Sequence, residues 1–142
     1  MENRSFDHLL GYSKLPIDGI PDWQTIPVDP GDLTKGVLLV NGEGKDECVD
    51  DPSHDFDSIT RQINGGKMDG FVKVSVDGGK DCMNTIQMFT PYSANIINSL
   101  AEEFAVLDRS FASIPTSTDP NRAMAMSGTS DGVVTNFNGT KW

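Results

Sequence analysis

The chain has 142 residues, of which 37% are hydrophobic and 23% charged, and 21 acidic residues against 11 basic ones give a formal net charge of −10. This length and composition are sufficient for one compact domain and exclude a chain that is disordered by composition. The acidic balance argues against a nucleic-acid-binding protein and against electrostatic adhesion to an anionic membrane, since both need a basic face. No apolar run approaches the roughly 20 residues of a transmembrane helix. The two cysteines, Cys48 and Cys82, fit either one disulfide or two reduced thiols.

The first half of the chain is predicted to contain a short helix, a strand and a longer helix. Ser5 can cap a helix over residues 6–10, which Gly11 ends. A loop rich in proline and glycine then leads to an apolar run at residues 37–40, which predicts a strand. An acidic loop follows, and its spacing does not match an EF-hand, so we interpret it as solvated. Residues 55–64 carry apolar side chains at helical spacing, which predicts a helix.

The second half of the chain is predicted to alternate strands and helices. Residues 71–76 alternate in polarity, which indicates a half-buried strand or an extended edge. Residues 92–104 predict a helix capped by Ser93, with one apolar stripe facing the core. The stripe consists of Ile96, Ile97, Leu100 and Phe104. Residues 105–107 then predict a short buried strand, and the order strand, loop, helix is typical of a layered α/β fold.

A turn that leads into a helix is predicted around residues 113–129, which read SIPTSTDPNRAMAMSGT. Residues 116–119 are all good N-cap types, and Pro120 suits the first helical turn, where a missing N–H costs nothing. A hydroxyl at such a helix start faces unpaired N–H groups and the positive end of the helix dipole. A nucleophilic serine or threonine that attacks a phosphoester fits here. An ordinary capped helix has the same pattern.

Two sequence motifs resemble a known family. The chain begins with MENRSFDHLLGY, and PTSTDPNRAMAMSGTS follows later, with GKMDGF and LAEEFAVLDR between them. These segments resemble the phosphoesterase family that includes phosphatidylcholine-type phospholipases C and bacterial acid phosphatases. The resemblance implies an α/β fold, an alkaline-phosphatase-like layered sheet with flanking helices, here truncated at both ends. Residues 1–142 would then be the N-terminal part of a single phosphoesterase domain.

The resemblance also implies a divalent metal ion whose identity the sequence does not fix. Its ligands would be Glu2, Asn3 and Thr118, and carboxylate and amide oxygens suit such a cation. Thr118 stands two positions before Pro-Asn-Arg, as the hydroxyl nucleophile does in the family motif, so its alkoxide would attack phosphorus. Ser117 and Thr116 are neighbouring hydroxyls and remain alternatives.

Four further side chains near these motifs are candidates for binding or catalysis. Asn121 could donate a hydrogen bond to a phosphoryl oxygen, and Arg122 could pair with phosphate or form a structural salt bridge. His54 could donate to a non-bridging oxygen or protonate the leaving alcohol, although a capping or surface role is equally open. His8 would orient the metal ligands or pack its helix.

The resulting hypothesis is a metal-dependent, phospholipase C-like hydrolase of phosphoester bonds that uses a threonine nucleophile. Its substrate would be a phosphodiester such as a phospholipid, or a phosphomonoester as in acid phosphatases. A catalytically incomplete fragment that keeps the motifs is the alternative. The C/S-x-P-S/A-R signature of sulfatases is absent from the sequence, which argues against a sulfatase.

Overall fold

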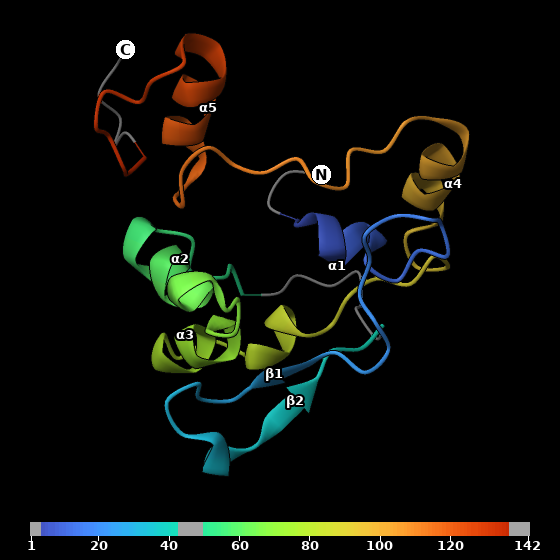
Figure 1. Cartoon of the computed structure of the whole chain (residues 1–142), viewed down its shortest axis with the longest axis horizontal. Coiled ribbons are helices and arrows are strands. Elements are labelled where there is room, and N and C mark those ends of the chain that lie inside the picture. Colours follow the sequence, from blue (N-terminus) through green and yellow to red (C-terminus); the bar gives the residue numbers. More distant parts are fainter. Residues whose placement is uncertain (1–3, 43–49, 137–142) are drawn as a thin grey trace.

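The computed structural model describes residues 4–42 and 50–136, which form short helices with a small hairpin at one edge of the molecule (Figure 1). The helices are α1 (Phe6–Leu10), α2 (Phe56–Ile63), α3 (Phe71–Asp77), α4 (Asn95–Glu103) and α5 (Thr118–Ser127). Short 3₁₀ turns occupy η1 (Leu33–Lys35), η2 (Asn64–Gly66) and η3 (Cys82–Thr85). The predicted helix over residues 6–10 is confirmed, with the Ser5 side chain accepting a hydrogen bond from the His8 N–H.

The hairpin consists of β1 (Thr25–Pro27) and β2 (Val37–Leu39), so the predicted strand near residue 37 is also confirmed. The two strands are antiparallel, with Ile26 opposite Leu38. A parallel bridge between Asn41 and Gln87 continues the pairing beyond the hairpin. Within residues 4–42 and 50–136, this two-stranded hairpin is the only β-sheet. The larger layered sheet remains a prediction.

The segment over residues 71–76 is helical, so the predicted strand is wrong. Helix α3 buries Val72 and Val74 and contacts α2, β1 and η3. Lys73 and Asp77 form an ion pair one turn apart, which supports a helix and not a strand. Tertiary packing therefore overrides the strand preference of the valines, which is weak and depends on context.

The core lies where α3 meets the hairpin and η3, and it continues along residues 86–89 to α1. Its buried apolar residues are Leu10, Val40, Val72, Val74, Ile86, Met88 and Phe89. The start of α3 approaches the end of α2 closely, because the N–H of Gly70 donates to the carbonyl of Gln62 at 3.0 Å. A Cβ atom at Gly70 would lie 2.1 Å from the carbonyl oxygen of Arg61, so glycine is required there. This contact fixes the C-terminal end of α2 against the start of α3.

Helix α2 confirms the predicted helix over residues 55–64 and begins at a well-formed cap. The carboxylate of Asp55 accepts hydrogen bonds from the Ser58 hydroxyl at 2.6 Å and the Ser58 N–H at 2.9 Å. These bonds hold the pKa of Asp55 below its ordinary value of 3.8. Since the folded pKa is lowered, the cap stabilises the protein fully above pH about 4 and loses its effect as the pH falls below that.

Replacing Asp55 with alanine is expected to lower the free energy of unfolding by about 1 kcal/mol at pH 7, because an N-cap acceptor is lost. The difference from the parent protein should shrink at about pH 2, well below the ordinary pKa of 3.8, as the parent carboxylate takes up a proton. Denaturant unfolding at both pH values measures this. Asp57→Ala is the matched control, because Asp57 lies in the first turn but does not cap the helix. An equal loss in both variants would contradict the capping role.

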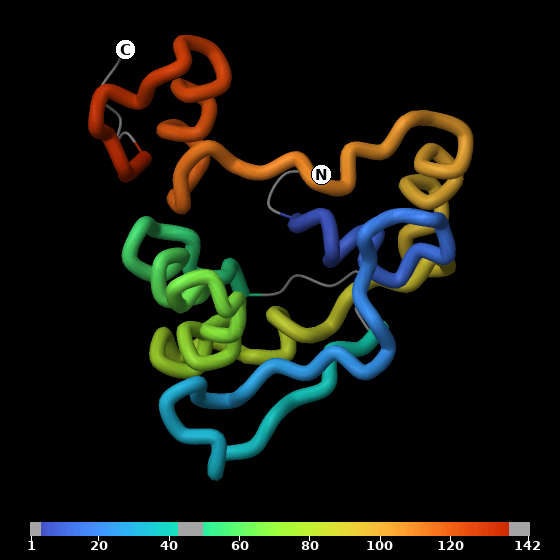
Figure 2. Tube along the Cα trace, in the orientation of Figure 1, coloured from blue at the N-terminus to red at the C-terminus, as the bar shows by residue number. Residues whose placement is uncertain are grey.

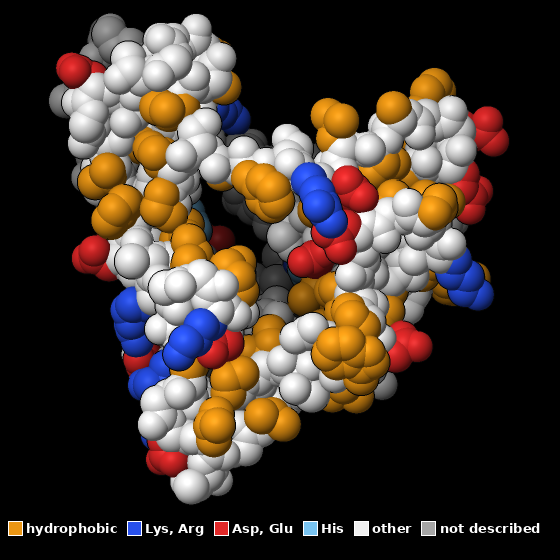
Figure 3. Space-filling model, viewed as in Figure 1, with side chains coloured by type: hydrophobic (Ala, Val, Ile, Leu, Met, Phe, Trp, Pro, Cys, Tyr) orange, Lys and Arg blue, Asp and Glu red, His pale blue; other side chains and the backbone are white. Residues whose placement is uncertain are grey.

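Helix α4 is confirmed as a helix, but most of its apolar stripe does not face the core. Ile96 is 72% exposed, Leu100 49% and Phe104 71%, whereas Ile97 is half-buried. The helix contacts α1 through its opposite side, where Asn98 is buried and donates to the carbonyl of Ala94. The predicted core face was wrong because, in the described residues, no element packs over the stripe. Figure 3 shows how widely apolar side chains are distributed over one face of the molecule.

Residues 105–107 do not form a strand, so that prediction is also wrong. They belong to an extended segment that runs from α4 to α5 across the molecule (Figure 2). Extended backbone becomes a strand only when a neighbour supplies hydrogen bonds, and none is paired with these residues in the described part of the chain. The predicted cap at Ser93 is wrong as well, because its hydroxyl bonds with Thr90 while Ala94 precedes the helix.

Candidate functional site

The site begins at the N-terminus of α5, which the sequence predicts correctly. Ser117 has extended backbone (φ −73°, ψ −169°) and precedes the first helical residue, Thr118. Pro120 lies in the first turn and is fully buried, and Gly128 ends the helix in the left-handed region at φ 74°. The proline fits because the first helical N–H groups have no intrahelical partner. Thr118 is therefore held at the positive end of the helix dipole.

Asn121 ties the turn before α5 to the helix. Its Nδ2 group donates to the carbonyl oxygens of Ile114 at 3.1 Å, Thr116 at 3.0 Å and Ser117 at 3.1 Å. Its Oδ1 atom accepts from the N–H of Ile114 at 3.2 Å. An amide nitrogen has two hydrogens, so these contacts occupy its donor capacity. Asn121 thus shapes the turn, and its direct contact with substrate remains a prediction.

Two polar contacts attach the same turn to the segment after α5. The hydroxyl of Thr116, which is buried, donates to the carbonyl of Val134 at 2.6 Å. The N–H of Asp119 donates to Oδ1 of Asn136 at 2.9 Å. The Thr116 hydroxyl is therefore engaged in the fold, which favours Thr118 and Ser117 over Thr116 as hydroxyls that face a substrate.

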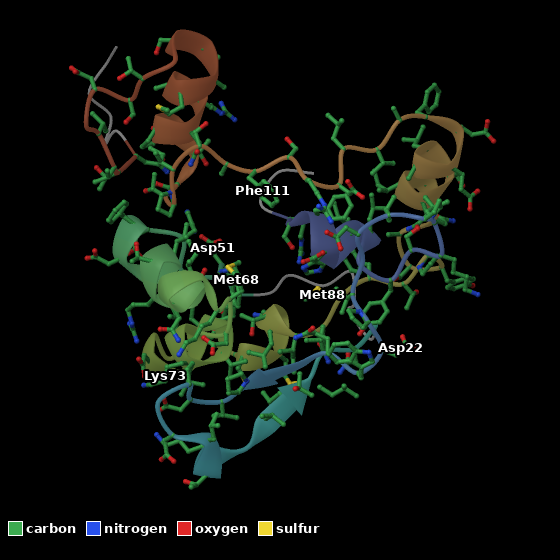
Figure 4. The ribbon with its side chains drawn as sticks, in the orientation of Figure 1. Asp22, Asp51, Met68, Lys73, Met88 and Phe111 are labelled. Carbon is green, nitrogen blue, oxygen red and sulfur yellow. The ribbon has the colours of Figure 1, made fainter. Side chains whose placement is uncertain are left out.

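His54 approaches this turn from a separate segment, residues 50–54, which we call the strap. Its Nδ1 atom lies 2.9 Å from the carbonyl oxygen of Pro52 and 3.6 Å from Oδ2 of Asp51. A carbonyl oxygen only accepts hydrogen bonds, so Nδ1 carries the proton and Nε2 has the lone pair in the neutral ring. Figure 4 shows Asp51 between α2 and α5.

Three side chains hold the strap in place through its main-chain carbonyls. Gln62 on α2 donates to Ser53 at 2.8 Å, Asn84 on η3 donates to Asp50 at 3.4 Å, and Lys80 donates to Asp51. Each donor comes from a segment that packs on the core around α3. The position of His54 is therefore set by the core and not by the strap alone.

The strap and the α5 turn enclose a cavity of about 260 Å³ that opens to solvent. Its described lining consists of Asp51, Pro52, His54, Thr116, Ser117, Thr118 and Asn121. The structure thus brings together His54, Thr118 and Asn121, which the sequence singled out separately. Arg122 is exposed and is not among the lining residues, so its pairing with phosphate remains a prediction.

An adjoining cavity of about 240 Å³ extends the site along the strap. His54 and Ser117 line both cavities, and Lys80 and Asn136 line the second. Sequence reasoning missed Lys80, Asn136 and Asp51. Lys80 follows a Gly-Gly turn and Asn136 lies in a polar tail, and neither belongs to a recognisable motif. Only the folded arrangement identifies them.

Three residues of the sequence-based hypothesis, Glu2, Asn3 and Cys48, lie outside the described residues. Among residues 4–42 and 50–136, no group of three or more His, Cys, Asp or Glu side chains is arranged to hold a metal ion. The predicted metal therefore depends on Glu2 and Asn3 together with Thr118. Within those same ranges no helix is long and apolar enough to cross a membrane.

His8, in the N-terminal motif, is a packing residue of α1. Its ring meets the edge of Phe89 with ring centroids 4.7 Å apart, and its Nε2 lies 3.2 Å from the Arg4 guanidinium. Burial, and secondarily the charge of Arg4, lower the pKa of His8 below 6.5. The ring therefore anchors the N-terminal motif to the core residue Phe89 as a neutral imidazole at pH 7.

Comparison with known proteins gives a consistent family assignment. The chain is 39% identical to non-specific phospholipase C1 and 34% identical to non-specific phospholipase C3, both from Arabidopsis thaliana. It is 31% identical to phospholipase C B from Mycobacterium tuberculosis. The alignments cover 96%, 98% and 89% of this chain but only 27%, 30% and 28% of those proteins. The mixture of helices with a small two-stranded sheet is consistent with an α/β phosphoesterase domain. The model of the Phosphoesterase family matches residues 1–141, and the chain therefore belongs to that family.

Proposed function

We propose that the protein hydrolyses phosphoester bonds, with phospholipids as substrates and Thr118 as the nucleophile. The observation that supports this proposal most directly is the cavity shared by Thr118 and His54, which belong to distant parts of the sequence. The named activities of its relatives, which are phospholipases C, support the substrate class. The chain would form the N-terminal part of one domain with an alkaline-phosphatase-like layered fold.

The proposed reaction has two steps, both at the hydroxyl of Thr118. In the first, Oγ attacks phosphorus, its proton passes to Nε2 of His54, and the bond from phosphorus to the leaving alcohol breaks. The alcohol takes up the proton from His54 as it leaves. In the second, water attacks phosphorus and gives a proton to Nε2 of His54, the bond from phosphorus to the Thr118 oxygen breaks, and His54 returns the proton to that oxygen, which restores the hydroxyl. The positive end of the α5 dipole stabilises negative charge on the phosphoryl oxygens.

A divalent cation bound by Glu2 and Asn3 would lower the pKa of the attacking hydroxyl and polarise a phosphoryl oxygen. Carboxylate and amide oxygens are suitable donors for such an ion. The described residues would position the nucleophile and the general base. Asn121 holds the turn that carries the nucleophile, and the carbonyl of Pro52 orients the His54 ring.

Hydrolysis of chromogenic phosphoesters tests this function. We expect the purified protein to release p-nitrophenol from p-nitrophenyl phosphorylcholine, and a chelator to reduce the rate at least about tenfold by removing the cation. Adding back single divalent ions should restore it and identify the metal. p-Nitrophenyl phosphate in parallel distinguishes a diesterase from a monoesterase. Full activity after chelation would contradict the proposed metal dependence. If p-nitrophenol is released from neither ester, the proposed activity is contradicted.

A further inference from the structure

Lys80 is fixed beside the candidate site by the end of α3. Its N–H donates to the carbonyl of Ser75 at 2.9 Å, which closes the turn formed by Gly78 and Gly79. Gly79 has φ 67°, a conformation that glycine adopts without strain. Because α3 is anchored by the buried Val72 and Val74, the base of the Lys80 side chain has a defined position.

The two carboxylates that line the second cavity together with Lys80 are engaged by other partners. The carboxylate of Asp55 caps α2 through Ser58, and that of Asp51 lies 3.6 Å from Nδ1 of His54. The described contact of Lys80 is with the main-chain carbonyl of Asp51 and not with a carboxylate. An ammonium group has three N–H donors, so further donors remain for a ligand.

We propose that Lys80 binds a non-bridging phosphate oxygen of the ligand in the cavity that it lines with His54 and Ser117. This inference rests on the proposed function and extends it by assigning a substrate-binding residue. A phosphate between the strap and α5 would meet the N-terminus of α5 on one side and Lys80 on the other. In a chain with a net charge of −10, a local cation offsets the repulsion between the phosphate and the protein.

Titration of the full chain with inorganic phosphate, by calorimetry at low ionic strength, tests this assignment. Lys80→Gln removes the charge and keeps an N–H donor for the Asp51 carbonyl, and we expect it to weaken binding about three- to tenfold. Lys80→Arg should retain most of the affinity, because the charge is restored. Near 1 M NaCl, where the Debye length is about 3 Å, the parent and Lys80→Gln should converge.

Lys73→Gln is the matched control, because it removes the same charge at a residue of α3 that is not among the residues lining either cavity. Lys73 pairs with Asp77 and lies away from Asp51 in Figure 4. Unchanged phosphate affinity in Lys80→Gln, equal weakening in both variants, or no phosphate binding by the parent chain would overturn the assignment. Circular dichroism verifies that each variant is folded. Hydrolysis of the chromogenic esters decides the proposed function separately, so the two ideas can fail independently.

Discussion

Replacement of Thr118 by alanine is expected to abolish phosphoester hydrolysis, with a loss of at least about a thousandfold in kcat, because the attacking oxygen is removed. The variant should remain folded, since Thr118 lies at the half-exposed start of α5 and the buried contacts of that turn belong to Thr116 and Pro120. Steady-state kinetics measure the loss. Phosphate binding should survive, because Lys80 and the positive end of the α5 dipole are unchanged.

Ser117→Ala is the matched control for this variant. Ser117 lines the same cavity, and in the part of the chain that the structure describes its hydroxyl makes no capping hydrogen bond to α5. We expect this variant to retain most of its activity and stability. Mass spectrometry of the acid-quenched parent enzyme should find a phosphoryl group on Thr118. If Ser117→Ala loses activity while Thr118→Ala keeps it, Ser117 is the nucleophile.

Replacement of Gly70 by alanine is expected to lower the free energy of unfolding by about 3 kcal/mol, which is a large share of a small domain's stability. The added methyl group would lie 2.1 Å from the carbonyl oxygen of Arg61, and that atom belongs to backbone that cannot rotate away. Relieving the overlap would separate α2 from α3 and break the hydrogen bond from Gly70 to Gln62. Denaturant unfolding followed by circular dichroism measures the loss.

Gly31→Ala serves as the comparison, because its added methyl group would meet the Asp29 carboxylate at 3.4 Å, an ordinary contact distance. We expect the stability of this variant to lie within about 0.5 kcal/mol of the parent. Similar stabilities for the two variants would show that α2 and α3 adjust freely, which would contradict the close backbone contact.

Local features of the fold could be predicted from the sequence, whereas features that depend on distant partners could not. The helix after Ser5 and the start of α5 follow from capping residues and a proline within a few positions. The strand predicted at residues 71–76 failed because helix or strand was decided by packing on α2 and η3. The stripe on α4 was identified correctly as apolar, but periodicity does not reveal whether another element covers it.

In the candidate site, too, the residues within sequence motifs could be predicted, whereas those brought in from distant segments could not. The motif around Thr118 and the possible role of His54 came from resemblance to a family, and the structure adds that both line one cavity. Lys80 could not be found in this way, because its position depends on the turn after α3 and on the strap beside it. A residue outside any motif becomes visible only when segments far apart in sequence are folded together.

The four hydrogen bonds of Asn121 have a mechanical consequence for the turn before α5. Because the Asn121 side chain forms hydrogen bonds with the backbone of three upstream residues, residues 114–121 should move as a single rigid body. A displacement of the segment between α4 and α5 would then tilt the whole first turn of α5 and leave its internal geometry intact. The Thr118 hydroxyl would keep its orientation relative to the neighbouring backbone even while the cavity widens or narrows.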